Sequence, residues 1–256
     1  MKILPKTQIA PHRSGHSHND EMQSRPLEQA LQEGFTSIEV DVHVVKGRLL
    51  VGHTAKDAVH KNLTLEDAYL APLHKRVEQF GSVYPQSTEV TLMLDFKGNA
   101  QTTYNTLLPL LQKYERMLVQ VHGGEQQAAP IKVVVTGNQP KLESLAERSI
   151  FFDGSLKQAL DHPGSLDPKV TPTVQANYHV YFRWNGEGTM PAGEREKLDR
   201  MTRSVHAQGL QMRLWDAPDK VRAWETFVAA GVDRVNTDDL DGFAAWQSVH
   251  GASKNA

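Results

Sequence analysis

The sequence contains no cysteine, which excludes a thiol nucleophile, a thiolate metal site and a disulfide. It also lacks any apolar run near the ~18 residues that a membrane span requires, and its first five residues show no apolar stretch of a secretory signal. Thirty acidic against 28 basic residues leave no excess positive charge, which argues against nucleic-acid binding. We therefore expect a soluble protein, either cytoplasmic or periplasmic or secreted after removal of a leader.

Short β-rich runs alternate with amphipathic helical stretches along the 256 residues, and no linker or low-complexity segment interrupts them. This alternation predicts parallel strands joined by right-handed crossovers. Eight such units in ~250 residues match the size of a (β/α)8 barrel. The rival, an open doubly wound sheet, lacks a GxGxxG turn here. We predict an α/β fold, a single (β/α)8 TIM barrel over residues 1–256, and expect a monomer.

The elements are placed by their composition and by Pro and Gly at helix ends. The first predicted parallel strand ends near residue 15. The other seven span 37–42, 91–96, 132–135, 150–152, 173–176, 211–214 and 233–235, and a hairpin strand is predicted at 48–52. The predicted helices cover 26–34, 64–81, 102–114, 142–147, 156–160, 191–209, 218–231 and 240–249.

Acidic side chains share one face of two predicted strands. Because side chains alternate across a strand, Glu39 and Asp41 point away from their apolar neighbours, and Asp95 shares a face with Met93 and Lys97. The ordinary interpretation of such a pattern is an antiparallel strand whose polar face lies in water. In a barrel, however, the acidic face points into the lumen, and active sites form at the end of the barrel where the strands end. Three acids so close need compensation. Their oxygens suit Mg²⁺ or Ca²⁺, and Lys97 either neutralises part of the charge or contacts an anionic substrate.

Three histidines stand out among the twelve. His16 and His18 lie where the first strand is expected to end, and His53 follows the hairpin strand and can fold back over Glu39 and Asp41. Histidines flanking a cation suit acid–base catalysis, in which one removes a proton from the nucleophile and the other protonates the leaving group. The ordinary alternative gives each of them a capping or loop-fixing role.

Two other functions are consistent with parts of this pattern. His16-x-His18 at the end of a first barrel strand also suits a zinc-dependent amidohydrolase, with Asp238 on the last strand as a further ligand. Such a site needs more histidines at the fifth and sixth strand ends, where only His179 lies near, and it leaves the three acids unused. A non-catalytic binding protein on the same barrel is the third hypothesis, which the intact acids and histidines disfavour.

Motifs that run through nearly the whole chain resemble a known family. They are HSHND, RPLEQAL, GFTSIEVDV, GRLLVGH, TLEDAYLAPL, LMLDFKG, FRWNGEGTMP, MRLWDAPD and GVDRVNTDDL. Together they resemble the phosphodiesterases related to phosphatidylinositol-specific phospholipase C, in the branch of the fungal altered-inheritance-of-mitochondria proteins. The resemblance implies a (β/α)8 barrel that acts on a small-molecule or lipid phosphodiester, with glycerophosphodiester phosphodiesterases and sphingomyelinases D as more distant relatives.

The resemblance also implies roles for individual residues. It implies Glu39, Asp41 and Asp95 as ligands of Mg²⁺ or Ca²⁺ and His53 as the second catalytic histidine. The first catalytic histidine is His18, within HND, or His16, which fits the spacing Gly-His-x-x-Asn; His18 is preferred. We further expect substrate contacts from three residues, Lys97, Trp215 and Asn19, with an ion pair to Asp95 as the alternative role of Lys97.

Two departures from the family pattern bear on the substrate. The third acid is Asp95, whereas glycerophosphodiester phosphodiesterases usually carry glutamate there. Glu21-Met22 follows HND where an aromatic residue is expected, which is expected to alter the pocket wall. The expected reaction is cleavage of a glycerophosphodiester- or phospholipid-like substrate, to either a hydrolysed or a cyclic product.

Overall fold

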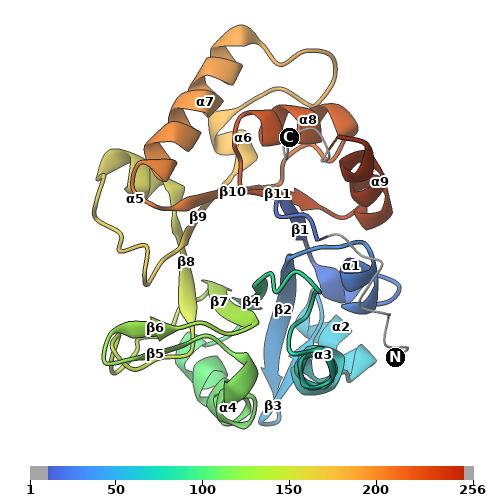
Figure 1. The fold of residues 1–256 in the computed structure, drawn as a ribbon, viewed down its shortest axis with the longest axis vertical. Coiled ribbons are helices and arrows are strands. Elements are labelled where there is room, and N and C mark those ends of the chain that lie inside the picture. Colours follow the sequence, from blue (N-terminus) through green and yellow to red (C-terminus); the bar gives the residue numbers. More distant parts are fainter. Residues whose placement is uncertain (1–10, 251–256) are drawn as a thin grey trace. The chain divides into compact units, whose positions relative to one another are not determined.

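The computed structural model describes residues 11–250, and the chain falls into two compact units. Unit 1 contains His18–Phe151, and unit 2 contains His12–Ser17 together with the chain that follows Phe151. In Figure 1 the first unit runs in colour from blue to yellow-green; the second runs from there to red and also includes the dark blue segment of residues 12–17.

Unit 1 contains three parallel strands, of which β4 is paired with both β2 and β7. These are β2 (Ser37–Val45), β4 (Val90–Phe96) and β7 (Ile131–Gly137), and β3 (Arg48–Val51) pairs with β2 in the antiparallel sense. The remaining elements are η1 (Asp20–Met22), α1 (Glu28–Gln32), α2 (Ala55–Lys61), η2 (Glu66–Leu70), α3 (Ala71–Phe80), α4 (Ala100–Lys113), η3 (Glu115–Met117) and the hairpin of β5 (Gln120–His122) and β6 (Glu125–Gln127).

Unit 2 contains five parallel strands, in the order β1, β11, β10, β9 and β8. They are β1 (Gly15–Ser17), β8 (Phe151–Ser155), β9 (Thr173–Asn177), β10 (Gln211–Trp215) and β11 (Arg234–Thr237). Its helices are α5 (Leu156–Asp161), α6 (Tyr178–Tyr181), α7 (Ala192–His206), α8 (Val221–Ala229) and α9 (Leu240–His250). Figure 1 shows α7 and α8 on the same side of β10, and the contacts of α7 with β10 and of α8 with β11 place them against the sheet.

The two units together contain the eight parallel strands that the sequence predicts, and the hairpin strand lies where it is expected. The helix predicted at 142–147 is wrong. Ser144 Oγ accepts hydrogen bonds from the N–H groups of Ala146 and Glu147, and Val121 and Arg148 exchange backbone hydrogen bonds. The segment therefore pairs with the β5–β6 hairpin, an element that the sequence analysis did not predict, as it did not predict α6. The extent of a single domain over residues 1–256 stays a prediction.

Both faces of β2 are buried, as is usual for a parallel strand. Ile38, Val40 and Val42 are fully buried on one face, and Glu39 and Asp41 are 4% and 0% exposed on the other. Burial of an ionised group is costly unless charges or hydrogen bonds compensate it. The acidic face of β2 is therefore the part of unit 1 that packing alone does not explain.

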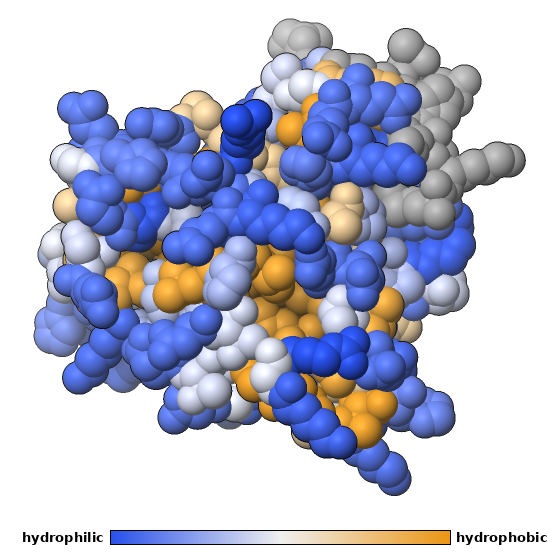
Figure 2. All heavy atoms as spheres, turned by 90° about the horizontal axis from the view of Figure 1, so that it is seen from below, coloured by the Kyte–Doolittle hydropathy of each residue, from blue (hydrophilic) through white to orange (hydrophobic). Residues whose placement is uncertain are grey.

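No helix within residues 11–250 is long and apolar enough to cross a bilayer. Figure 2 shows one face of the molecule, on which hydrophilic side chains surround smaller apolar areas. The large apolar side chains that are exposed among the described residues come from different elements: Met22, Val59, Leu145, Val180, Trp215, Val221 and Val249.

Candidate active site

Asp41 and Asp95 are register partners on the neighbouring strands β2 and β4 of unit 1. Lys97, which directly follows β4, reaches both carboxylates: its Nζ lies 2.5 Å from Asp95 Oδ2 and 3.2 Å from Asp41 Oδ1. Both acids therefore form ion pairs with Lys97, while their roles as metal ligands and a contact of Lys97 with substrate stay predictions.

The carboxyl group of Asp41 is fully buried, and its pKa is strongly raised. Burial raises the pKa of its carboxyl to about 6, and the neighbouring charges of Asp95 and Glu39 add to the rise while Lys97 opposes it. Burial also acts to lower the pKa of Lys97, but the two carboxylates outweigh it and raise that pKa. Among residues 11–250, neither carboxylate oxygen of Asp41 accepts a hydrogen bond. Within the described chain, the buried oxygens of Asp41 are therefore compensated only by ion pairs with Lys97 and His53. Buried carboxylate oxygens of this kind are suited to bind a cation.

Glycine at position 137 makes room for the Asp95 carboxylate. Gly137 ends β7 beside β4, and a Cβ built on it would overlap Asp95 Oδ1. Its φ of +69° also lies in the left-handed region that favours glycine. A side chain at this position would therefore displace the carboxylate.

Glu39 lies on the same face of β2 as Asp41, two residues earlier, and its register partner is Met93. Met93 belongs to a buried apolar cluster with Val119, Val121, Val134 and Phe151. Glu39 therefore lies beside this apolar cluster. Its charge contributes to the raised pKa of Asp41. Coordination of one ion by Glu39, Asp41 and Asp95 together stays a prediction.

His53 lies beside Asp41 at the end of the hairpin. The hairpin is closed by a backbone bond from Gly52 N–H to Asp41 O at 3.2 Å, and His43 Nε2 lies 2.9 Å from Gly52 O. His53 Nδ1 lies 3.3 Å from Asp41 Oδ2, while 54% of its side chain is exposed. The imidazole is therefore fixed at one nitrogen by a carboxylate and remains open to solvent.

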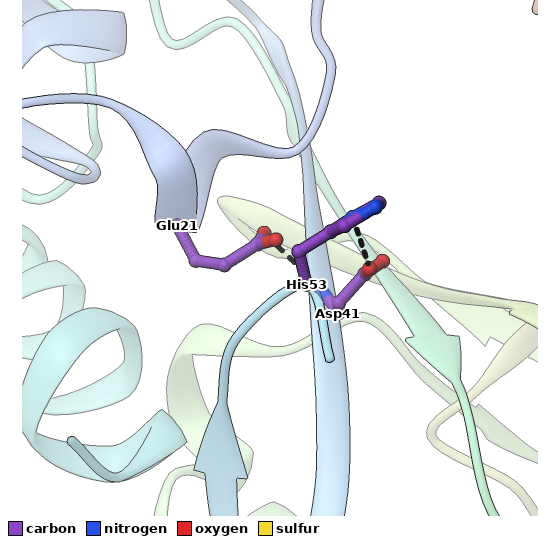
Figure 3. A group of neighbouring side chains, drawn as sticks. All are labelled: Glu21, Asp41 and His53. Carbon is purple, nitrogen blue, oxygen red and sulfur yellow. Dashed lines mark hydrogen bonds and ion pairs between the residues drawn. The ribbon is translucent and has the colours of Figure 1, made fainter. Parts of the chain in front are cut away.

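The structure adds Glu21 to this group, in a position that the sequence analysis treated only as pocket wall. Glu21 is 2% exposed, and its Oε2 accepts a 3.2 Å hydrogen bond from Asp41 N–H. Burial, and next the charge of Asp41, raise the pKa of Glu21 to about 8. Figure 3 shows the side chains of Glu21, Asp41 and His53 turned toward one another from η1, β2 and the end of the hairpin. The signal that could have revealed it is a charged residue where the family pattern expects an aromatic one.

His16 and His18 lie in different surroundings. His18 belongs to unit 1, is partly exposed, and its Nδ1 lies 3.4 Å from Nδ2 of Asn19. His16 lies on β1 in unit 2, is fully buried, and its Nε2 lies 3.3 Å from Arg213 Nη1. Arg213 in turn donates from Nη2 to Asp153 Oδ2 at 3.1 Å. His16 is thus part of a buried cluster with an ion pair, whereas His18 is accessible.

The other predicted residues are placed in unit 2. Trp215 ends β10, is 37% exposed and bonds from Nε1 to Oε1 of Gln175. Within residues 11–250, the one group of three or more side chains suited to a metal is Glu21, Asp41 and His53. His16, His18, His179 and Asp238, the residues of the amidohydrolase hypothesis, do not belong to that group.

Comparisons with known proteins identify the family of the chain. The model for the AIM6-like phosphodiesterase domain matches residues 6–153, more than half of the chain, and that for the Glycerophosphoryl diester phosphodiesterase family matches residues 211–241. The Altered inheritance of mitochondria protein 6 homolog of Arthroderma benhamiae is 25% identical, over 88% of this chain and 81% of that protein. Altered inheritance of mitochondria protein 6 of Lachancea thermotolerans is 25% identical, over 94% of this chain but 65% of that longer protein.

Solved structures of low identity share the fold. A glycerophosphodiester phosphodiesterase from Agrobacterium tumefaciens superposes with a TM-score of 0.52 at 15% identity, covering 93% of this chain and 100% of that one. One from Parabacteroides distasonis gives 0.50 at 13% identity, covering 95% and 97%. The predicted (β/α)8 TIM barrel is thereby confirmed. The chain belongs to the AIM6-like phosphodiesterase domain family, a branch of the superfamily of phospholipase C-like and glycerophosphodiester phosphodiesterases.

Proposed function

We propose that this chain is a metal-dependent phosphodiesterase that cleaves a small-molecule or lipid phosphodiester by two-histidine acid–base catalysis. The observation that carries the proposal is the position of Asp41, which is fully buried between His53 at 3.3 Å and Lys97 at 3.2 Å. A buried carboxylate, an open imidazole and a lysine converge here, as the cleavage of an anionic ester requires. The family match and the names of the similar solved structures support the choice of a phosphodiester.

The residues present fit a hard divalent cation. The oxygens of Asp41 are buried and accept no hydrogen bond from residues 11–250, and Asp95 is its register partner. In this proposal Glu39, Asp41 and Asp95 hold Mg²⁺ or Ca²⁺, both of which prefer oxygen ligands. Such an ion polarises a non-bridging phosphoryl oxygen and reduces the cost of charge building on the phosphate.

His53 is suited to move a proton. Its Nδ1 faces Asp41 Oδ2, which orients the ring and leaves Nε2 free to exchange a proton with the substrate. His18 is the preferred partner, because His16 is fully buried and its Nε2 faces the guanidinium of Arg213.

The proposed reaction exchanges one ester oxygen at phosphorus for another. One histidine removes the proton from a substrate hydroxyl or from water as its oxygen bonds to phosphorus, and the other histidine protonates the departing alkoxide as its bond breaks. Attack by a neighbouring hydroxyl gives a cyclic phosphate, and attack by water gives a monoester. Lys97 supplies positive charge to the phosphoryl oxygens, and Asn19 is proposed to contact the remainder of the substrate. A substrate contact of Trp215 stays a prediction from the sequence.

The test is a panel of phosphodiesters, including bis-p-nitrophenyl phosphate, glycerophosphodiesters and lysophospholipids, assayed with Mg²⁺, Ca²⁺ or a chelator. We expect chelator-sensitive turnover that falls at least ~10²-fold in His53→Ala and His18→Ala. His60→Ala is the matched control, because His60 is an exposed histidine on α2 of the same unit. Chelator-insensitive turnover, or full activity of His53→Ala, would contradict the proposal, and absence of any cleavage would favour a non-catalytic binding protein.

A further inference from the structure

Glu21 is held in place from several directions. The chain turns sharply at Asn19, whose φ of 45° is left-handed, and enters η1. The next residue, Asp20, is fully buried, and its Oδ2 accepts hydrogen bonds from Leu27 N–H at 2.6 Å and Tyr69 O–H at 2.8 Å. Lys61 Nζ donates to the backbone oxygen of Glu21 at 2.9 Å. These contacts fix the backbone of η1, so the direction of the Glu21 side chain is determined by the fold.

The carboxylate of Glu21 is incompletely compensated. Its Oε2 accepts the 3.2 Å bond from Asp41 N–H, but Oε1 is buried and accepts no hydrogen bond from any described residue. Lys61 contacts the backbone oxygen of Glu21 and the carboxylate of Asp57. No lysine or arginine within residues 11–250 forms an ion pair with the Glu21 carboxylate, although Asp41 lies beside it with a charge of the same sign.

The spacing of the three side chains leaves room for a cation. One ligand atom from each of Glu21, Asp41 and His53 lies within 4.8 Å of the other two. Two ligands that each touch a divalent cation at about 2.0–2.6 Å are at most about twice that distance apart. Figure 3 shows the Glu21 carboxylate reaching the backbone of Asp41, while the Asp41 carboxylate and the His53 imidazole lie beside each other. Glu21 Oε1 is buried and accepts no hydrogen bond from any described residue. A bound cation would compensate this oxygen.

We propose that Glu21 is a further carboxylate ligand of the cation at Asp41, supplied by η1 in place of the aromatic residue of the family pattern. The inference rests on the proposed function, because it takes a cation at Asp41 as given. It adds an oxygen ligand from η1 to those proposed from β2 and β4. His53 keeps its role as proton carrier and borders the same space.

The experiment measures binding of Mn²⁺ to the purified full chain at neutral pH, from the electron paramagnetic resonance signal of the free ion, with Mg²⁺ and Ca²⁺ as competitors. We expect Glu21→Gln to weaken binding at least ~10-fold. Glu78→Gln is the matched control and should stay within ~2-fold of the wild type, because Glu78 is 67% exposed and contacts only His74 in a surface pair.

Thermal unfolding separates a ligand from a merely structural residue. In chelator, Glu21→Gln should unfold at the same temperature as the wild type or a higher one, because the substitution replaces an ionisable carboxyl group that is costly to bury. With Mn²⁺ added, the rise in unfolding temperature should be smaller for Glu21→Gln than for the wild type. A lower unfolding temperature in chelator together with an undiminished Mn²⁺-induced rise would show that Glu21 is structural only and would overturn the inference.

The failures of the two proposals are distinguishable. If the wild type binds Mn²⁺ and Glu21→Gln binds it equally well, the inference about Glu21 is wrong and the metal-dependent function is untouched. If the wild type binds none of the three cations, the metal dependence of the proposed function is wrong, and the inference about Glu21 fails with it. Asp41→Asn should lose Mn²⁺ binding under both proposals.

Discussion

Asp41 and Asp95 lie side by side in the register of β2 and β4, and Lys97 Nζ lies within 3.2 Å of the first and 2.5 Å of the second. Two carboxylates at this separation repel each other, and one of them is fully buried. The lysine therefore supplies, within the chain, part of the positive charge that this pair needs.

The first prediction concerns this lysine. In chelator, Lys97→Met should lower the free energy of unfolding by about 2 kcal/mol, because it leaves the buried Asp41 without its cationic neighbour. Lys113→Met is the control: Lys113 also lies 2.5 Å from a carboxylate, that of Glu66, but its side chain is 61% exposed. Its loss should cost much less than that of Lys97, because solvent screens an exposed pair. Urea unfolding measures the free energy of unfolding of both variants. If Lys97→Met and Lys113→Met lower it equally, burial of Asp41 does not strengthen its ion pair with Lys97.

The second prediction is a pH dependence of stability. The pKa of Glu21 is raised to about 8 from an ordinary value of 4.5, so between these values the folded protein binds more protons than the unfolded chain. The free energy of unfolding should therefore fall as the pH rises through this range. In Glu21→Gln the part of this decline that comes from Glu21 should vanish. Between the two pKa values, the free energy of unfolding of the variant should rise relative to that of the wild type by on the order of 4 kcal/mol.

Urea unfolding at a series of pH values, with a chelator present throughout, checks this second prediction. Glu78→Gln, which changes an exposed glutamate, should keep the slope of the wild type. Parallel pH profiles of the wild type and Glu21→Gln would show that Glu21 is not the titrating group.

The third prediction concerns Gly137. Alanine there should cost more stability than the ~1 kcal/mol typical of a left-handed glycine, because its Cβ overlaps Asp95 Oδ1. Gly81→Ala is the matched control, since Gly81 has a similar φ of +73° but an added Cβ there would meet no atom within 4 Å. Gly137→Ala should also weaken Mn²⁺ binding by displacing Asp95, whereas Gly81→Ala should not. Equal effects of the two substitutions on stability and binding would refute this account.

The fourth prediction separates the two N-terminal histidines. His16→Ala should lower the free energy of unfolding by about 2–4 kcal/mol, because it opens a cavity beside the buried pair of Arg213 and Asp153. His18→Ala should cost under about 1 kcal/mol, since His18 is partly exposed, but it should abolish most phosphodiester cleavage. Paired unfolding and activity measurements check this. A stable, inactive His16→Ala would reverse the assignment.

Much of the site could be predicted because strand periodicity is a local property. The alternation of side chains placed Asp41 on one face of β2 and Asp95 on one face of β4, and the structure makes them register partners. The hairpin turn after β2 likewise predicted the return of His53. Where a helix was predicted at 142–147, a local pattern misled, because the hairpin of β5 and β6 offers that backbone better partners.

The sequence by itself determined the eight parallel strands and the acids and histidines that they carry, since periodicity, Pro and Gly are written in neighbouring residues. The tertiary structure alone decided that Glu21 faces Asp41 and that His16 faces Arg213. The first depends on a left-handed turn at Asn19 and on distant partners of Asp20. The second depends on a strand almost two hundred residues away in the chain. Which charges meet is set by packing over long sequence separations, which no local pattern encodes.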